Sequence, residues 1–238
     1  MTGESLGTVI SVRGEAQRTV EPESAVLTCV ITSTRLAKPD ALKAAADALN
    51  HLRDALDVLG GVPLTAETGR SMLTWSAHST RTYIERELQA KTGRHEPTGQ
   101  VVASVELNLA VRDFGLLERL GAVLAAHEDL HVFHVAWLVD DDNPTWPAVR
   151  AEAIRAAVQQ ARHYAAALGG SLSRIEQLAD AGLLGEIHEI RPVQAAAAAH
   201  GLARGDSGDA PSLDPVPQTI AAAIDARFIA DAMSIDDT

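Results

Sequence analysis

The sequence has few aromatic residues and a single cysteine. Only 3% of its 238 residues are Phe, Trp or Tyr, so a core has to be built from Val, Leu, Ile and Ala. With Cys29 alone, an internal disulfide and a cysteine-based zinc cluster are excluded. Cys29 stands in the strand-like segment VLTCVIT, and we interpret it as a buried small apolar residue and not as a reactive thiol.

Positive charge is also scarce. The chain has 20 Lys and Arg against 32 Asp and Glu, a net charge of −12. This balance argues against binding to nucleic acid or to an anionic membrane, because both need clustered basic residues. No apolar run approaches the ~20 residues that cross a bilayer, and the first 16 residues do not resemble a signal peptide. We therefore expect a soluble cytoplasmic protein.

The hydrophobic pattern predicts an α+β fold with long, mostly antiparallel strands and about three helices packed on the sheets. Val105, Leu107, Leu109 and Val111 alternate with polar or small residues, which is typical of a strand with one buried face. Strands are predicted over 8–13, 25–32, 69–82, 101–111, 132–139, 173–179 and 219–230, and helices over 40–59, 113–126 and 145–168. The order strand, strand, helix occurs twice, which predicts an internal duplication.

Proline and glycine set the expected boundaries. Pro39 and Pro144 suit helix starts, and Gly60-Gly61 and Gly169-Gly170 suit helix ends. Residues 91–99 are predicted to be a loop between two strands. Residues 181–214 have no clear period and are predicted to form a long loop or flap within a single domain over 1–238.

The segment HEDLH at 127–131 matches the H-E-x-x-H pattern of zinc peptidases. In such a site His127 and His131 bind the metal from one face of a helix, and Glu128 is the general base. The usual continuation of the pattern is missing, because His134 and Trp137 stand where it needs Gly and His. Glu152 would be a distal third ligand.

A junction between a helix and a strand is the competing interpretation of HEDLH. A strand is predicted to begin at Val132, and Asp129 is unfavourable in the middle of a helix. We prefer the junction, with His127 near the carboxyl end of the helix.

Two further motifs have simpler interpretations. Gly205-Asp206-Ser207-Gly208-Asp209 resembles the nucleophile segment of chymotrypsin-like proteases, but those are disulfide-rich β-barrels, so a polar loop is preferred. Asp140–Asp142 could bind calcium, but lacks the remaining positions of an EF-hand loop. A solvated turn is the preferred interpretation there.

Several marks, taken in order along the chain, resemble the SIMPL-domain family, also known as DUF541, over nearly the whole length. These are Val12-x-Gly14, then Glu21-Pro22-Glu23-Ser24-Ala25, Asn50, Val111-Arg112-Asp113, and the alanine series Ala153, Ala157, Ala161, Ala165 that ends in Leu168-Gly169. Glu23 replaces the usual Asp, and Gln100 follows Gly99 where the family often has an aromatic residue. The export signal of many bacterial relatives is absent, so a periplasmic role is not carried over.

The resemblance implies a function through assembly. The family is named for an animal protein that associates with a signalling kinase. Its bacterial members are linked to stress tolerance and surface antigenicity, and some form large homo-oligomers. It has no agreed catalytic residues, so no catalytic, cofactor-binding or metal-binding residue and no cofactor is predicted here. We expect a non-enzymatic protein that acts as a homo-oligomer or through a protein partner. The alternatives are a zinc hydrolase using His127, Glu128 and His131, and a small-molecule binding module beneath the 181–214 flap.

Overall fold

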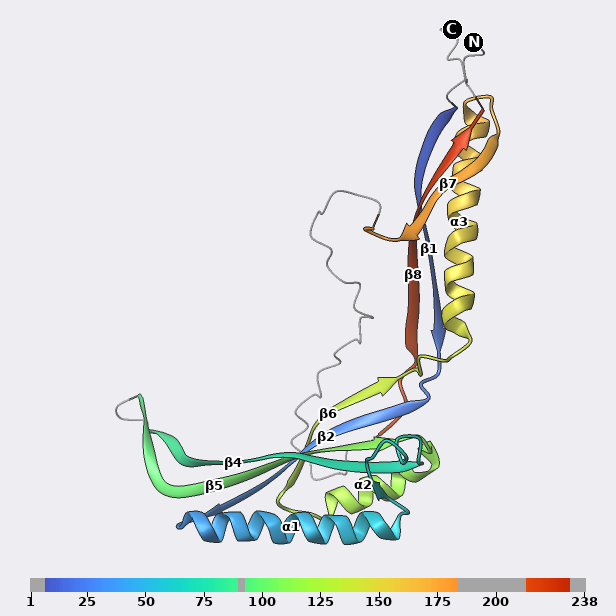
Figure 1. The fold of residues 1–238 in the computed structure, drawn as a ribbon. Coiled ribbons are helices and arrows are strands. Elements are labelled where there is room, and N and C mark those ends of the chain that lie inside the picture. The colour runs from blue at the N-terminus through green and yellow to red at the C-terminus, as the bar shows by residue number, and fades with distance from the viewer. Residues whose placement is uncertain (1–6, 90–92, 184–212, 232–238) are drawn as a thin grey trace. The chain divides into compact units, whose positions relative to one another are not determined.

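A computed structural model describes residues 7–89, 93–183 and 213–231 of the chain (Figure 1). By their contacts the elements form two compact units, a five-stranded unit and a three-stranded unit, which confirms the α+β class. The single domain predicted over residues 1–238 stays a prediction. The elements are, in chain order, β1 Thr8–Val20, β2 Ser24–Arg35, α1 Lys38–Val58, β3 Val62–Pro63, β4 Leu73–Gln89, β5 Arg94–Val111, the short 3₁₀ helix η1 Phe114–Leu116, α2 Leu117–Ala125, β6 Leu130–Leu138, α3 Thr145–Ala167, β7 Leu172–Asp180 and β8 Gln218–Ala230.

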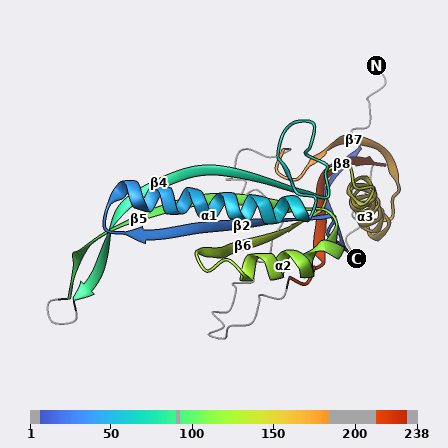
Figure 2. The same ribbon diagram turned by 90° about the horizontal axis from the view of Figure 1, so that it is seen from below.

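The five-stranded unit has the strand order β3-β4-β5-β2-β6. Because β2 and β4 both pair antiparallel with β5, the segment β2-α1-β4 is a crossover between two parallel strands with one strand between them. The segment β5-α2-β6 is a second crossover of the same kind. Together they give the ferredoxin-like β-α-β-β-α-β arrangement. Figure 2 shows α1 and α2 on the same face of this sheet.

The core of the five-stranded unit lies between the sheet and these helices. Leu27 and Ile31 of β2 and Leu107 and Leu109 of β5 point into it and are at most 1% exposed. This is the period of two that the sequence shows over β5. On α1, Leu52 and Leu56 complete the core.

The three-stranded unit has the order β1-β8-β7, and α3 covers one face of it. α3 presents the stripe Ala153, Ala157, Ala161 and Ala165 to the sheet, and all four are at most 1% exposed. Because alanine is small, the helix lies very close to β1. A Cβ added at Gly14 would lie 2.0 Å from the carbonyl oxygen of Ala153. The alanine series is therefore a close-packing surface.

The two units share a topology. In the three-stranded unit the elements follow one another along the chain as β1-α3-β7-β8, and the strands lie side by side in the sheet as β1-β8-β7. In the five-stranded unit the chain order β2-α1-β4-β5 likewise gives the sheet order β2-β5-β4. Both helices end in a Leu-Gly-Gly Schellman motif. Gly61 N donates to Leu56 O at 2.8 Å, and Gly170 N donates to Ala165 O at 2.9 Å. The sequence predicted a repeat of strand, strand, helix around residues 40–59 and 113–126, which are α1 and α2. Because β1 and β2 lie in different sheets, the repeat in the topology is instead strand, helix, strand, strand around α3 and α1.

Three sequence predictions need correction or fall outside the description. The loop predicted over 91–99 is wrong from residue 94 onwards, because β5 begins at Arg94 and pairs with β4 from there. The strand predicted over 69–82 begins later, at Leu73, and continues to Gln89. Of the predicted flap at 181–214, residues 184–212 lie outside the described residues.

Candidate functional site

The segment HEDLH is a junction between α2 and β6. α2 ends at Ala125, and the amide of His127 donates to Leu124 O at 3.3 Å. The chain then turns, with Leu130 N donating to His127 O at 3.1 Å. The carbonyl oxygen of Asp129 accepts from Thr32 N at 2.8 Å, which anchors the turn to β2. The preferred interpretation of HEDLH as a junction is confirmed.

This geometry differs from that of a zinc peptidase. His131 lies in β6 opposite Val30, so His127 and His131 do not share a helix face. Glu152, the distal candidate ligand, belongs to the three-stranded unit, where it accepts hydrogen bonds from Arg18. The bond from Arg18 holds the pKa of Glu152 below its usual value. Within the described residues, no three His, Cys, Asp or Glu side chains gather where they could hold a metal ion.

A partly open pocket of about 140 Å³ lies between α1 and this junction. His51 of α1 contributes to its wall together with His127, Glu128 and Asp129. Sequence patterns do not connect His51 with HEDLH, because the contact depends on the packing of α1 against α2. Pockets for small molecules usually measure about 300–1,000 Å³. This one is suited to a few waters or a small ion and not to an organic substrate.

Cys29 is not a nucleophile in the folded protein. Its side chain is 0% exposed, and burial raises the pKa of the thiol to about 12. The thiol is therefore protonated at neutral pH, and the prediction of a buried apolar residue is confirmed.

Of the two remaining motifs, the structure describes only the Asp140–Asp142 segment. Ser207 and the rest of Gly205–Asp209 lie outside the described residues. The carbonyl oxygen of Asp140 accepts from Asn143 N at 3.1 Å and from Trp146 Nε1 at 2.9 Å. The Asp140–Asp142 segment thus leads into a turn at the start of α3, where Asn143 Oδ1 also accepts from Thr145 N at 2.8 Å.

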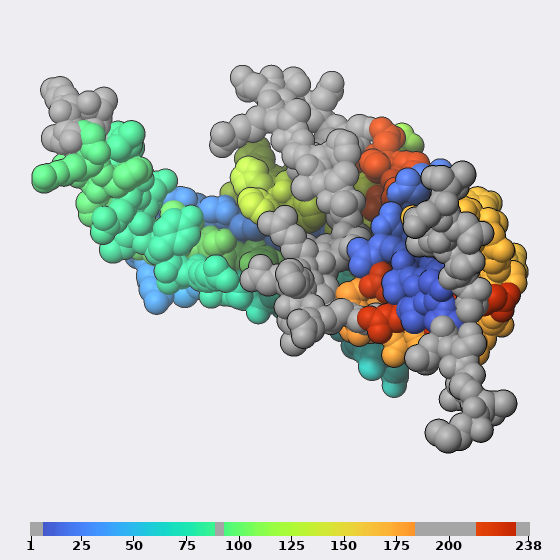
Figure 3. All heavy atoms as spheres, turned by 90° about the horizontal axis from the view of Figure 1, so that it is seen from above, coloured from blue at the N-terminus to red at the C-terminus, as the bar shows by residue number. Residues whose placement is uncertain are grey.

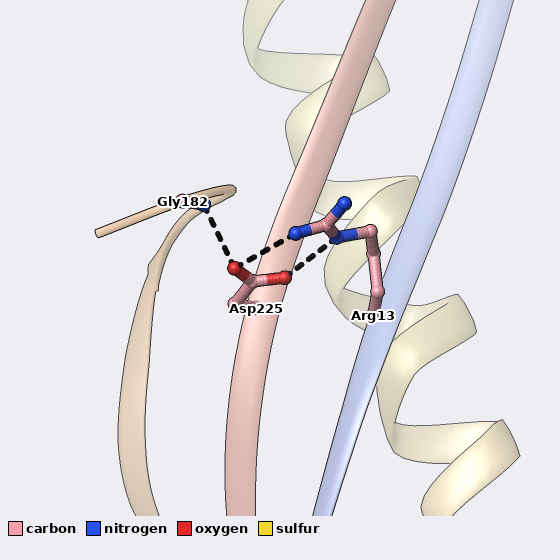
Figure 4. A network of polar contacts seen from close by, with 3 residues as sticks. All are labelled: Arg13, Gly182 and Asp225. Carbon is pink, nitrogen blue, oxygen red and sulfur yellow. Dashed lines mark hydrogen bonds and ion pairs between the residues drawn. The ribbon is translucent and has the colours of Figure 1, made fainter. Parts of the chain in front are cut away.

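A polar network joins three segments on the sheet face of the three-stranded unit that α3 does not cover. Figure 4 shows the guanidinium of Arg13 on β1 making two hydrogen bonds, of 2.7 and 3.1 Å, to the carboxylate of Asp225 on β8. Gly182 N donates to the same carboxylate at 2.8 Å. The bond from Arg13 is the main reason that the pKa of Asp225 lies below its usual value. The network links β1, β8 and the turn after β7, and the Arg13 guanidinium is hydrogen-bonded to Asp225 within it.

The outer half of the β4–β5 hairpin, which we call the arm (residues 83–89 and 94–100), carries three exposed large apolar side chains. Tyr83, Ile84 and Leu88 are 55%, 58% and 56% exposed, and residues 94–100 of β5 are exposed throughout. On the face drawn in Figure 3 the arm extends beyond α1 and β2 of the same unit. The pairing shifts between Ile84 and Arg86, opposite Gly99 with φ 81°, where the hairpin bends (Figure 1).

The comparisons with known proteins concern the whole chain. The SIMPL family, described as a protein of unknown function (DUF541), matches residues 10–228. The comparison with curated proteins gives no match. Among the described residues, none of the helices combines the length and apolar character that spanning a membrane requires. Because the match covers β1 through most of β8 and therefore both units, the chain belongs to the SIMPL (DUF541) family.

Proposed function

We propose that the protein is a non-enzymatic assembly protein whose arm docks onto another copy of the chain. The observation that supports this is the exposure of Tyr83, Ile84 and Leu88. Tyr83 and Ile84 lie opposite the last residues of β5 that pair with β2, and Leu88 lies on the two-stranded ribbon beyond them. A two-stranded ribbon alone is marginally stable in water, because it has no sheet face to bury. Exposed large apolar side chains at the base of such an element and along it are typical of a surface that another protein covers.

The charges of the arm also support docking. Glu87 of β4 lies directly opposite Glu96 of β5, and two like charges in this position destabilise the pairing of the strands. Among the described residues of the arm, Thr98 Oγ1 makes the side-chain hydrogen bonds across the ribbon, to Glu85 Oε2 at 3.0 Å and to Glu85 O at 3.4 Å. The arm thus has little to stabilise it within its own chain, and docking would offset the repulsion.

The non-enzymatic character rests on the described groups that could carry chemistry. HEDLH is a junction, Cys29 is buried, and the pocket at His51 and His127 is small. A cytoplasmic location and a link to stress tolerance stay predictions.

Mass measurement tests the assembly. At micromolar concentration, light scattering after size exclusion should give a multiple of the 25.1 kDa chain mass. The combined variant Tyr83→Ser, Ile84→Thr and Leu88→Ser should raise the dissociation constant at least about tenfold, because it removes the apolar contacts of the arm.

The matched control is the pair Leu36→Ser and Val58→Ser in the same unit. These residues are 83% and 79% exposed but lie outside the arm, so the assembly should keep its mass. A wild-type protein that stays monomeric, with no partner bound through the arm, would contradict the proposal.

A further inference from the structure

Within the described residues, the three-stranded unit has no counterpart of α2 and β6 of the five-stranded unit. In the five-stranded unit β6 pairs antiparallel with β2, and α2 packs beside α1. In the three-stranded unit, β1 takes the place of β2 and α3 that of α1. Among the described residues, β8 is the only strand that pairs with β1, and α3 is the only helix of this unit. The edge of β1 opposite β8, which no described residue pairs with, is therefore the place that β6 fills in the other unit.

The flank of α3 that borders this edge carries two exposed apolar side chains near the carboxyl end of the helix. Glu152 stands one residue before Ala153 of the alanine stripe and pairs with Arg18 of β1, so this flank of the helix points towards β1. Tyr164 stands one residue before Ala165 and lies on the same flank, because the stripe repeats every four residues. Leu168 follows Tyr164 by one turn. Their side chains are 50% and 46% exposed.

The comparison of the two helices identifies the same flank independently. When the Leu-Gly-Gly ends are matched, Tyr164 takes the place of Ala55 and Leu168 that of Leu59, and both residues of α1 are half-buried. Gln160 takes the place of His51, which lines the pocket at the junction leading into β6. The flank of α1 that faces the α2–β6 junction thus corresponds to the flank of α3 that carries Tyr164 and Leu168.

We propose that the edge of β1 and this flank of α3 bind the same surface of a second copy, with the two β1 strands paired antiparallel about a two-fold axis. The three-stranded sheets of the two copies would then join into one six-stranded sheet, with both α3 helices on one face. The inference rests on the assembly proposed above and adds a second interface to it. Two different interfaces on each copy permit assemblies larger than a dimer.

The side chains of β1 suit pairing with itself. In a register centred on Gly14, Arg13 lies opposite Glu15 of the second copy, and Ser11 lies opposite Gln17 of the second copy. No like charges are then opposed within the strand pair over residues 8–20, although the whole chain carries a net charge of −12. Val12 lies opposite Ala16 of the second copy, and both side chains point to the helix face, so each sheet keeps its apolar face against α3.

Cysteine cross-linking tests the register directly. Residues opposite each other in antiparallel strands have Cα atoms about 4.5–5.5 Å apart, which suits a disulfide. Under mild oxidation the double variant Ser11→Cys/Gln17→Cys should give covalently linked dimers. Each single variant should not, because equal residues of the two copies lie far apart in this register. The native Cys29 is buried and present in all three proteins.

A charge substitution tests the flank. Tyr164→Lys with Leu168→Lys should raise the dissociation constant of this interface at least about tenfold. The matched control is Ile175→Lys with Leu178→Lys, which changes two equally exposed apolar residues on β7, at the opposite edge of the sheet. Retained mass is expected for this control.

The outcomes separate the two proposals. Cross-linked dimers with loss of mass only in the Tyr164 and Leu168 variant support the β1 interface. An oligomeric wild type that neither cross-links nor loses mass in that variant overturns the β1 interface and leaves the arm proposal standing. The β1 interface is also overturned if the Ile175 and Leu178 control loses as much oligomer mass as the Tyr164 and Leu168 variant. It is overturned too if the chain's own residues 184–212 cover the β1 edge. An arm variant that keeps its full mass overturns the arm proposal alone.

Discussion

Gly14 of β1 packs directly against the backbone of α3, and it has no space for a side chain. A Cβ there would lie 2.0 Å from Ala153 O and 2.5 Å from Ala157 N, both backbone atoms that cannot move alone. We predict that Gly14→Ala lowers the free energy of unfolding of the three-stranded unit by about 3 kcal/mol or more, because the helix must shift away from the sheet. Urea unfolding followed by circular dichroism measures this change.

Gly69→Ala is the control for this substitution. The nearest atom to a Cβ at Gly69 is Thr65 O at 3.6 Å, an ordinary contact distance. Its unfolding curve should match that of the wild type. Coinciding curves for Gly14→Ala and Gly69→Ala would show that α3 does not pack against β1 as described.

At the scale of elements, the Arg13–Asp225 pair joins the first and last strands of the three-stranded unit. The pKa of Asp225 is below its unfolded value of about 3.9. The pair therefore stabilises the fold fully above that value, and its contribution is lost as the pH falls through the lower folded pKa. We predict that Asp225→Asn costs about 1 kcal/mol at pH 7, since the carboxylate is 19% exposed, and less as the pH approaches 2.

Asp47→Asn is the matched control. The pair between Lys43 and Asp47 spans 3.5 Å, and both side chains are more than half exposed. This variant should unfold like the wild type at both pH values in the same urea titrations. A pH-independent cost for Asp225→Asn would contradict the ionic origin of the stabilisation.

The sequence predicted where helices and strands lie along the chain better than which elements contact one another in the fold. α3 was predicted over 145–168 and spans Thr145–Ala167, because Pro144 and Gly169-Gly170 are local signals that set its ends. The outer half of the β4–β5 hairpin was missed, because polar residues 91–99 resemble a loop and strand pairing depends on residues far along the chain. The pocket wall at His51 and the exposed flank at Tyr164 were missed for the same reason. HEDLH was interpreted correctly, because the strand that follows it is visible in the sequence.

At the scale of the whole molecule, the five-stranded unit is inserted between β1 and α3. The chain enters it at β2 and leaves it after β6, and these ends are adjacent, since Glu23 N donates to Leu138 O at 2.8 Å. We predict that residues 21–139 fold alone, because the fragment contains all five strands and both helices of the unit. A single cooperative thermal transition in circular dichroism measures this.

A shorter fragment provides the comparison. Residues 21–111 lack α2 and β6, which leaves the core without Leu120, Leu124 and Leu130. This fragment should show no cooperative transition. Failure of the longer fragment to fold would show that the unit depends on the rest of the chain, for example on Leu213, which packs against its core.

The pairing of β1 with β8 also has a mechanical consequence. The two strands run antiparallel along their whole length, from Thr8 opposite Ala230 to Val20 opposite Gln218. A pulling force applied at Thr8 and Ala230 therefore loads the ladder at one end, and the backbone hydrogen bonds break one rung after another as in a zipper. Shearing two strands past each other would load all rungs at once. Tension across these two points should therefore open the three-stranded unit at low force and peel β1 away from β8 and α3.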